Sequence, residues 1–318
     1  MAQTSDSLAV ETPLDSIQTQ NIKIQEVKIS ENETFIYQKP KIWDVVNKMP
    51  KNIAGTATDI VSKKYYPYGL AALGSTVALI PTDPWVIRES RNLGETLGMN
   101  EAHTYHKLGF LKIIPADVNS ALYFIGNGTT VILISGGLAT YGLFKNDYRA
   151  ISTSMQLVES LALSGIFAQS IKRITGRESP FITADRNGWH SHWTFAPSFA
   201  AYQGDTSRYD AMPSGHLTTA MAALTVLAEN YKDYKWIKPV SYTALALMSF
   251  EMMQSKVHWA SDYPIALFMG YLIGKNIAKA RITKVNNSPM AENKKKYNLQ
   301  LSAGSLYGYQ TIGVNIKF

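Results

Sequence analysis

Residues 212–228 read MPSGHLTTAMAALTVLA, and this stretch joins a short opening of small residues to a continuous apolar run. The Pro-Ser-Gly opening at residues 213–215 predicts a helix that starts with small side chains and free backbone N–H groups. Such a start attracts anions through its unpaired donors and its dipole. Gly215 lets the backbone approach a ligand closely, and His216 would lie in the first turn beside a bound anion. Taken alone, the stretch is a weak functional signal.

A second stretch places a histidine and a carboxylate about one helical turn apart. His258 and Asp262 are four positions apart, which brings both side chains to one face if the segment is helical. The carboxylate would then accept a proton from one imidazole nitrogen and leave the other nitrogen free as a nucleophile. An exposed helical pair with a purely structural role fits the same spacing equally well.

A third stretch ends an apolar segment with three cations. Lys172, Arg173 and Arg177 lie within six residues, just before Ser179 and Pro180. Cations are ordinary partners of a helix C-terminus, and long cationic side chains also serve as anchors at membrane surfaces. The same three groups would equally suit the binding of a phosphate.

The chain around these stretches is apolar in its middle. Apolar residues make up 46% of the 318 residues and charged residues 17%, below the roughly 25% of soluble globular domains. The longest apolar segment approaches the roughly 20 residues that a membrane-spanning helix needs. The pattern predicts an all-α bundle of about six core helices, either in a membrane, which we favour, or as a soluble bundle. The expected helical segments cover residues 69–80, 119–144, 155–171, 217–228, 240–253 and 263–278.

Both ends of the chain differ from this middle. Residues 1–42 are rich in Ser, Thr, Gln and Glu without helical periodicity, which predicts a flexible arm. Residues 43–283 are expected to form the helical domain. Residues 284–318 are expected to form a polar linker and then a short β-hairpin, because apolar and polar residues alternate around Gly304 and Gly308.

The composition also limits the classes of function. The absence of cysteine excludes disulfide frameworks, thiol nucleophiles and Cys-type zinc sites. The net charge of +7 would suit anionic partners such as phosphates or lipid headgroups. Basic residues are not gathered in one arm and no nucleic-acid motif is visible. No ligand cluster in the sequence argues for a metal or another cofactor.

The order and spacing of the three stretches resemble the tripartite signature of the type 2 phosphatidic acid phosphatase (PAP2)/vanadium haloperoxidase family. Its first motif is Lys, six residues and Arg-Pro; its second is Pro-Ser-Gly-His; its third is Ser-Arg, five residues, His, three residues and Asp. Lys172 and Pro180 match the first motif, and residues 213–216 match the second in full. His258 and Asp262 match the third. The resemblance covers about residues 60–280, and its local strings are similar to those of bacterial envelope members.

Two signature arginines are replaced in this chain. Ser179 stands at the arginine of the first motif, and Glu251 and Met252 stand at the Ser-Arg of the third. In the family both arginines hold phosphate oxygens, a task suited to a planar and permanently charged fork. Their loss is expected to weaken transition-state binding by about 1.5–3 kcal/mol per charged hydrogen bond. The nearby cations expected to compensate are Arg173, Arg177, Arg208 and Lys256.

The resemblance implies a metal-independent phosphatase acting on a phosphate monoester or diphosphate, lipid-linked or small. His258 would attack phosphorus to give a phosphohistidine, Asp262 would orient it, and His216 would protonate the leaving oxygen and later activate water. The phosphate oxygens would be held by Lys172, Arg177, Ser214 and the Gly215 N–H. The implied location is the bacterial cell envelope, as a multi-pass membrane protein with its site on the periplasmic side. No cofactor is implied.

Two other functions stay open at this point. One is a catalytically weak or inactive relative that binds phosphate or lipid headgroups, which the replaced arginines favour. The other is a vanadate-dependent haloperoxidase, against which the same replacements count. The sequence does not choose among phosphatidic acid, phosphatidylglycerol phosphate, undecaprenyl diphosphate and lipid A phosphates as substrate. His103 and His106 are expected to be structural or exposed, and His190 and His192 to be polar loop residues.

Overall fold

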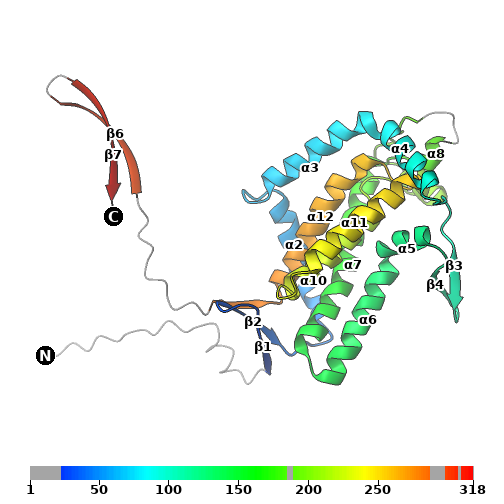
Figure 1. The fold of residues 1–318 in the computed structure, drawn as a ribbon, viewed down its shortest axis with the longest axis horizontal. Helices are drawn as coiled ribbons and strands as arrows, with labels where there is room; N and C mark the ends of the chain where they lie inside the picture. Colours follow the sequence, from blue (N-terminus) through cyan, green and yellow to red (C-terminus); the bar gives the residue numbers. More distant parts are fainter. Residues whose placement is uncertain (1–22, 185–188, 287–297, 307–308, 318) are drawn as a thin grey trace.

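The computed structural model describes residues 23–184, 189–286, 298–306 and 309–317, and these residues are mostly helical (Figure 1). The expectation of an all-α bundle with a short C-terminal hairpin is confirmed. The helices are α2 (Asp44–Ile60), α3 (Tyr66–Leu79), α4 (Asp83–Thr96), α5 (Val118–Ile125), α6 (Gly128–Lys145), α7 (Tyr148–Thr175), α8 (Pro180–Ala184), α9 (Phe199–Gly204), α10 (Gly215–Asn230), α11 (Ile237–Gln254) and α12 (Tyr263–Lys279). Short 3₁₀ turns lie at η1 (Ile80–Thr82), η2 (Thr206–Arg208) and η3 (Ala260–Asp262).

Helix α10 forms the centre of the bundle and packs most extensively against α12 and α7. One apolar cluster joins α6, α7, α10 and α12, and it includes Leu157, Ala222 and Ile273. A second cluster joins α10, α11 and α12 through Leu217, Met248 and their neighbours. Because α10 is enclosed from several sides, its first turn is held in a fixed position at one end of the bundle.

Helix α7 carries a buried polar stripe that ties distant segments together. Glu159 is fully buried and accepts hydrogen bonds from Asn52 Nδ2 and Arg281 Nη2, each at 2.6 Å. A buried carboxylate needs such partners, since an unpaired buried charge is strongly destabilising. The contacts therefore fix α2 and the end of α12 against α7.

Helix α7 ends where the chain must turn toward the candidate site. Gly176 adopts the left-handed conformation at φ 53° and caps the helix, with its N–H bonded to Lys172 O at 2.9 Å. A Cβ at this position would lie 1.8 Å from Thr194 O, so only glycine fits. The close approach holds the aromatic loop after α8 against the end of α7.

The expected single helix over residues 119–144 is wrong. The chain instead forms α5 and α6, which are bent by 72° relative to each other. Asn127 starts α6 by accepting a hydrogen bond from Thr129 N at 2.9 Å. At the bend, a Cβ on Gly126 would lie 2.9 Å from His216 Cβ, so the bend lets the backbone pass directly over that histidine.

Part of the expected N-terminal arm is instead a sheet. Strand β1 (Ile24–Lys28) pairs antiparallel with β2 (Glu33–Gln38), and β2 pairs with β5 (Thr283–Asn286), in the register Phe35↔Lys284. Phe35 and Tyr37 are fully buried against residues at the end of α12. The pairing of β1 with β2 is local, whereas β5 lies some 250 positions from β2, so a distant segment completes the sheet. Residues 1–22 of the expected arm lie outside the described residues.

Two further strand pairs complete the described chain. Strands β3 (Tyr105–Leu108) and β4 (Leu111–Pro115) form a hairpin just before α5. Strands β6 (Asn298–Leu306) and β7 (Tyr309–Lys317) pair antiparallel in the register Leu301↔Val314, which confirms the hairpin expected near the C-terminus. Strand β5 occupies the start of the expected polar linker, so that segment begins as part of the first sheet.

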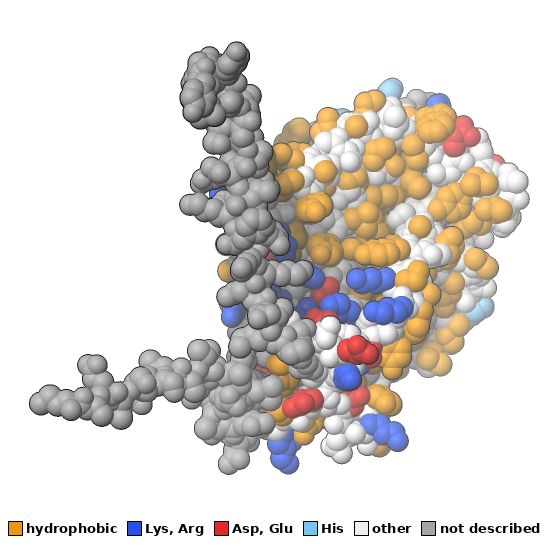
Figure 2. Space-filling model, turned by 60° about the vertical axis from the view of Figure 1, so that its left-hand side comes forward, with side chains coloured by type: hydrophobic (Ala, Val, Ile, Leu, Met, Phe, Trp, Pro, Cys, Tyr) orange, Lys and Arg blue, Asp and Glu red, His pale blue; other side chains and the backbone are white. Residues whose placement is uncertain are grey.

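Several helices turn apolar side chains outward. Figure 2 shows hydrophobic side chains spread over the face of the bundle, while Lys, Arg, Asp and Glu gather toward its lower end. In the described residues, Tyr66–Thr96 and α7 are long and apolar enough to cross a membrane, and α5 with α6 could form a third, bent span. Only 17% of the apolar stretch within Tyr66–Thr96 is buried, so its apolar side chains face out of the protein. This distribution favours a membrane protein.

Candidate active site

His216 lies in the first turn of α10 and faces His258. The centroids of the two rings are 6.3 Å apart, with an angle of 67° between their planes. Two imidazoles at this separation can contact one ligand of the size of phosphate. The structure thus brings together two histidines that are 42 positions apart in the sequence. Tyr123 covers another side of His216, with ring centroids 4.6 Å apart.

The start of α10 is built by Ser214. Its backbone is extended, and its Oγ accepts a hydrogen bond from Leu217 N at 3.3 Å, so Ser214 is the N-cap. The first intrahelical hydrogen bond runs from Thr218 N to Ser214 O at 3.0 Å. The N–H groups of Gly215 and His216 precede that bond, and they supply the donors with which a helix start binds an anion. Ser214 was expected to bind phosphate, but its hydroxyl serves the helix cap.

His258 is 4% exposed and lies over the carboxylate of Asp262. Nδ1 of the imidazole is 3.5 Å from Asp262 Oδ2, which is an ion-pair distance rather than a well-formed hydrogen bond. Contacts of this kind often tighten only when substrate binds. Because Nδ1 faces the carboxylate, Nε2 points to the opposite side of the ring. This is the arrangement needed for an oriented nucleophile.

Asp262 is itself held from three directions. Its Oδ2 accepts a hydrogen bond from Trp259 N at 2.8 Å, and its Oδ1 accepts one from Arg177 Nη1 at 2.6 Å. Its backbone carbonyl accepts a hydrogen bond from Ser214 N at 3.3 Å. The last contact joins the two halves of the site, because it ties the turn before α12 to the start of α10.

Arg177 lies behind the site. Its guanidinium is fully buried, and besides Asp262 it donates to Ser261 Oγ and to Asp83 Oδ2, each at 2.6 Å. The rings of Trp193 and Trp259 flank it at 4.7 and 5.3 Å. These contacts differ from the expected phosphate role of Arg177. Both terminal nitrogens are taken up by carboxylates, so the residue orients Asp262.

Lys172 is the cation placed beside the two histidines. Its side chain is 7% exposed, and its Nζ lies 3.6 Å from the point where a Cβ on Gly215 would be. Asp210 Oδ2 is 3.5 Å from the same nitrogen. Because Gly215 has no side chain, the ammonium can approach the start of α10, where it adds positive charge to the helix dipole.

A cavity of about 240 Å³ opens beside His216, between the α5–α6 bend, α7 and the start of α10. Its polar lining includes Lys172, Gln169, Ser164 and Thr219. His258 is not part of this lining, so the cavity reaches the two-histidine site from the His216 side. A substrate that entered here would meet Lys172 and the first turn of α10 before it reached His258.

Met252 and Ser179, which the sequence comparison expected in place of two arginines, are both buried. Met252 is fully buried in the cluster between α10, α11 and α12, and its Sδ lies 3.9 Å from Ser214 Oγ. Ser179 is 4% exposed, and its backbone N–H donates to Ser207 O at 3.0 Å. Neither side chain offers a charge to an oxyanion.

The cations expected to compensate have other partners. Arg173 stacks on Tyr202, with its guanidinium carbon 3.6 Å from the ring centroid. Arg208 pairs with Asp205 at 2.5 Å and is half exposed. Lys256 pairs with Glu101 at 2.7 Å. Within the described residues, Lys172 is thus the side-chain cation in the lining of the cavity.

A histidine–glutamate pair near the site was missed by sequence reasoning. His103 Nε2 lies 2.6 Å from Glu251 Oε1, and Glu251 is fully buried with its Oε2 unpaired. The His103 ring stacks on Tyr123 at 3.9 Å, and Tyr123 in turn contacts His216. Glu251 is an acid within the apolar run of residues 240–253, and this was the signal that a basic partner should be sought. His106, by contrast, is exposed on β3 as expected.

The surroundings of His216 favour its neutral form. Burial, and then the charges of His258, Lys172 and His103, lower its pKa to about 3. The unfolded chain would bind a proton at this residue below about pH 6.5, whereas the folded chain would not until about pH 3. The folded state therefore loses stability as the pH falls through this window.

Replacement of His216 by asparagine is expected to reduce the acid sensitivity of the fold. Between pH 7.5 and 5 the titration of His216 costs the native protein up to about 2 kcal/mol, and an asparagine does not titrate. Thermal unfolding of the purified protein at both pH values measures the difference. His106→Asn, at an exposed position, is the control. An H216N variant that loses as much stability on acidification as the parent would contradict this account.

The fold and the convergent residues define a helical bundle that brings two histidines, an aspartate and a lysine to one end. Residues 153–285 match the model of the PAP2 superfamily, and these residues include Lys172, His216, His258 and Asp262. Over these residues the chain is therefore similar to the PAP2 superfamily.

Comparisons with curated proteins and with solved structures add less information about this chain. No curated protein matches the chain. A similar solved structure is the first transmembrane PAP2 type phosphatidylglycerolphosphate phosphatase from Bacillus subtilis, with 13% sequence identity and a TM-score of 0.34. The match covers 75% of this chain and 96% of that one.

Proposed function

We propose that the chain is a phosphatase that hydrolyses a phosphate monoester or diphosphate through a phosphohistidine intermediate, without the help of a metal. The observation that carries the proposal is the 6.3 Å separation of the His216 and His258 rings, with Asp262 behind His258 and Lys172 beside Gly215. The match of residues 153–285 to the model of the PAP2 superfamily supports a function of the phosphatase type.

In the first half of the reaction, Nε2 of His258 attacks phosphorus. A P–N bond forms while the P–O bond to the leaving group breaks, and the leaving oxygen takes a proton from His216. A substrate dianion between the two rings raises the pKa of His216, because an adjacent negative charge favours the imidazolium. The bound substrate thereby helps to charge the acid that its own cleavage requires.

In the second half, water attacks phosphorus and gives its proton to His216. The P–N bond breaks, and inorganic phosphate and free His258 are regenerated. The neutral state that burial imposes on His216 suits this base role. Asp262 keeps the proton of His258 on Nδ1 in both steps, so Nε2 is free to attack and later to leave.

The equatorial oxygens would be held by Lys172 and by the N–H groups of Gly215 and His216. Charge-assisted contacts to such donors are the main source of transition-state stabilisation in phosphoryl transfer. Compared with a site that holds two arginines, this set offers fewer fixed donors, and Glu251 and Asp210 add negative charge nearby. Phosphate binding is therefore expected to be weak.

That weakness also favours a second candidate function. With Met252 and Ser179 in the places of two cations, the chain would bind phosphate or lipid headgroups in the cell envelope and turn over poorly or not at all. The outward apolar faces of α3, α6 and α11 fit a membrane location, and hence a lipid-linked phosphate. We place the protein in the bacterial envelope, with the site on its periplasmic side.

The test is hydrolysis by the purified full chain in the presence of a chelator. We expect release of phosphate from para-nitrophenyl phosphate or phosphatidic acid, and inhibition by vanadate, which resembles the pentacovalent transition state. Phosphate binding by calorimetry without any turnover would select the second function. Loss of activity on chelation that added metal restores would contradict the mechanism.

A further inference from the structure

A pair of adjoining cavities, one polar and one apolar, lies at the other end of α10. His216 and Glu229 are thirteen residues apart on one helix, which corresponds to about 20 Å. The polar cavity of about 240 Å³ is formed by the second half of α10, the start of α11 and the second half of α12. It is therefore separate from the candidate active site.

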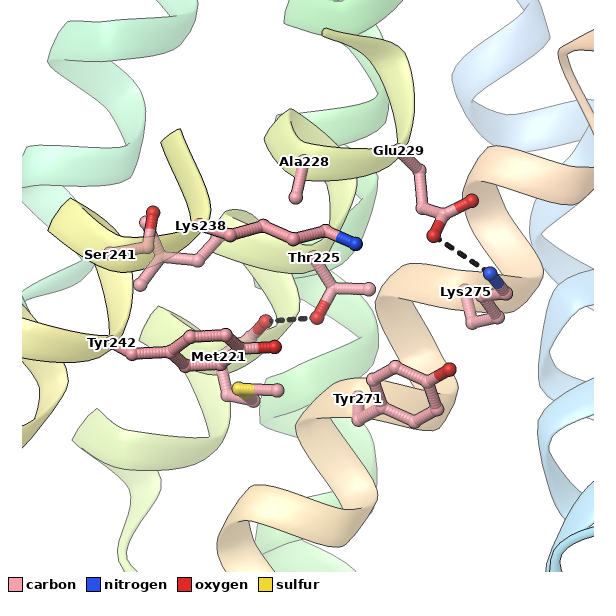
Figure 3. A pocket seen from close by; sticks show the side chains of 10 residues that line it. Met221, Thr225, Ala228, Glu229, Lys238, Ser241, Tyr242, Tyr271 and Lys275 are labelled. Carbon is pink, nitrogen blue, oxygen red and sulfur yellow. Dashed lines mark hydrogen bonds and ion pairs between the residues drawn. The ribbon is translucent and has the colours of Figure 1, made fainter. Parts of the chain in front are cut away.

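Two lysines meet in this polar cavity. Lys275 pairs with Glu229 at 2.7 Å, while no ion pair in the described residues involves Lys238. Figure 3 shows the Lys238 side chain extended across the cavity, with its Nζ toward the side where the Glu229–Lys275 pair lies. The hydroxyl-bearing rings of Tyr242 and Tyr271 lie below it (Figure 3). The lining thus holds more positive than negative charge, with neutral donors nearby.

An apolar groove of about 430 Å³ adjoins the polar cavity. The two share Leu224 and Ser241, so they are continuous on the surface. The groove is lined by aliphatic and aromatic side chains of α10, α11 and the turn between them: Leu227, Tyr231, Tyr234, Trp236, Ile237, Val240 and Ala244. Trp236 and Val240 are more than half exposed, so the groove opens outward.

The aromatic residues indicate the depth of this site in a membrane. Tyrosine and tryptophan gather where the hydrocarbon core meets the headgroups, and Tyr231, Tyr234 and Trp236 form such a group at the α10–α11 turn. Lysines at that depth meet lipid phosphates, and each contributes about 1 kcal/mol near an anionic surface. The apolar groove runs from the same level along α11.

We propose that the two cavities together bind one anionic phospholipid, with its phosphate between Lys238 and Lys275 and one acyl chain in the groove. The charge of the cavity complements the phosphate, and the groove complements the chain. A zwitterionic lipid would fill the groove equally well. Its headgroup cation, however, would lie near Lys238 and weaken the binding of its phosphate. The proposal depends on a membrane location and not on catalysis at His258.

Native mass spectrometry of the detergent-solubilised full chain tests this proposal. Phosphatidylglycerol is the anionic probe, because its phosphodiester is not a phosphate monoester, and phosphatidylcholine is the zwitterionic comparison. We expect Lys238→Gln to weaken phosphatidylglycerol binding about fivefold, as loss of about 1 kcal/mol implies, and to leave phosphatidylcholine binding unchanged. Ala244→Trp, which fills the groove, should weaken both.

Matched controls separate the outcomes. Lys232→Gln removes a lysine near the same end of the bundle that pairs with Glu33 outside both cavities, and it should have no effect. Inorganic phosphate alone should not compete at millimolar concentration, because it lacks the chain. Equal binding of the two lipids by the parent protein, or equal effects of K238Q and K232Q, would overturn the proposal. So would loss of phosphatidylglycerol binding in His258→Ala, which would place the lipid in the active site.

Discussion

Replacement of His258 by alanine is expected to lower turnover by a factor of about 10³ or more, because it removes the group that attacks phosphorus. The same change should abolish an acid-labile phosphoryl group that is trapped on the enzyme during turnover of labelled substrate. Because His258 is 4% exposed, its truncation also removes buried packing, so thermal unfolding of H258A is measured to show that the variant is folded at the assay temperature. The readout is initial rate together with retention of label after rapid quenching.

The matched control is His106→Ala. His106 is exposed on β3 and lies outside the candidate site, so its loss should leave the rate unchanged. A protein that keeps its activity without His258, or that carries the label on another residue, would refute the phosphohistidine mechanism. If neither the parent nor H258A turns over substrate while both bind phosphate, the second function is the correct one.

The local parts of the site were predictable because each depends on a short stretch. Pro-Ser-Gly before an apolar run indicated the start of α10. His258 and Asp262 do face each other, but His258 lies in a bend and Asp262 in the 3₁₀ turn η3, so the expected shared face of an α-helix is wrong. Lys172 followed from the same kind of reasoning, since Gly176 ends α7 just beyond it. The apolar runs likewise located most helices of the bundle.

The parts that failed depend on partners far away in the sequence. Asp83, which takes one nitrogen of Arg177, lies 94 positions before it, and Glu251 lies 148 positions after His103. A charged residue beside a motif cannot be assigned to substrate or to fold until its partners are known. The strand β5 that completes the sheet at residues 24–38 is distant in the same way, although β1 and β2 pair with each other locally. The bend at Gly126 was missed although Gly126, Asn127 and Gly128 interrupt the apolar run with residue types typical of turns and helix starts.

The sequence predicts that Arg177 binds phosphate, whereas the structure indicates that it orients Asp262. Replacement of Arg177 by methionine discriminates between these two roles. In the structure, the guanidinium holds the buried carboxylates of Asp83 and Asp262. Removing one partner of a buried ion pair leaves charge uncompensated and costs about 3–5 kcal/mol. We therefore expect R177M to lower the free energy of unfolding by this amount, and to lower kcat because Asp262 no longer orients His258.

Arg208→Met is the control for R177M, since Arg208 forms a half-exposed pair with Asp205, and pairs of that kind contribute at most about 1 kcal/mol. Adding Asp83→Asn to R177M should recover part of the lost stability, because it removes one of the two carboxylates left unpaired. If Arg177 instead bound the phosphate of the substrate, the result would differ. R177M would then raise KM and weaken vanadate inhibition, while thermal unfolding stayed unchanged. That pattern, with no recovery of stability on adding D83N, would assign Arg177 to phosphate binding. Trp259 N would then be the group that orients the Asp262 carboxylate.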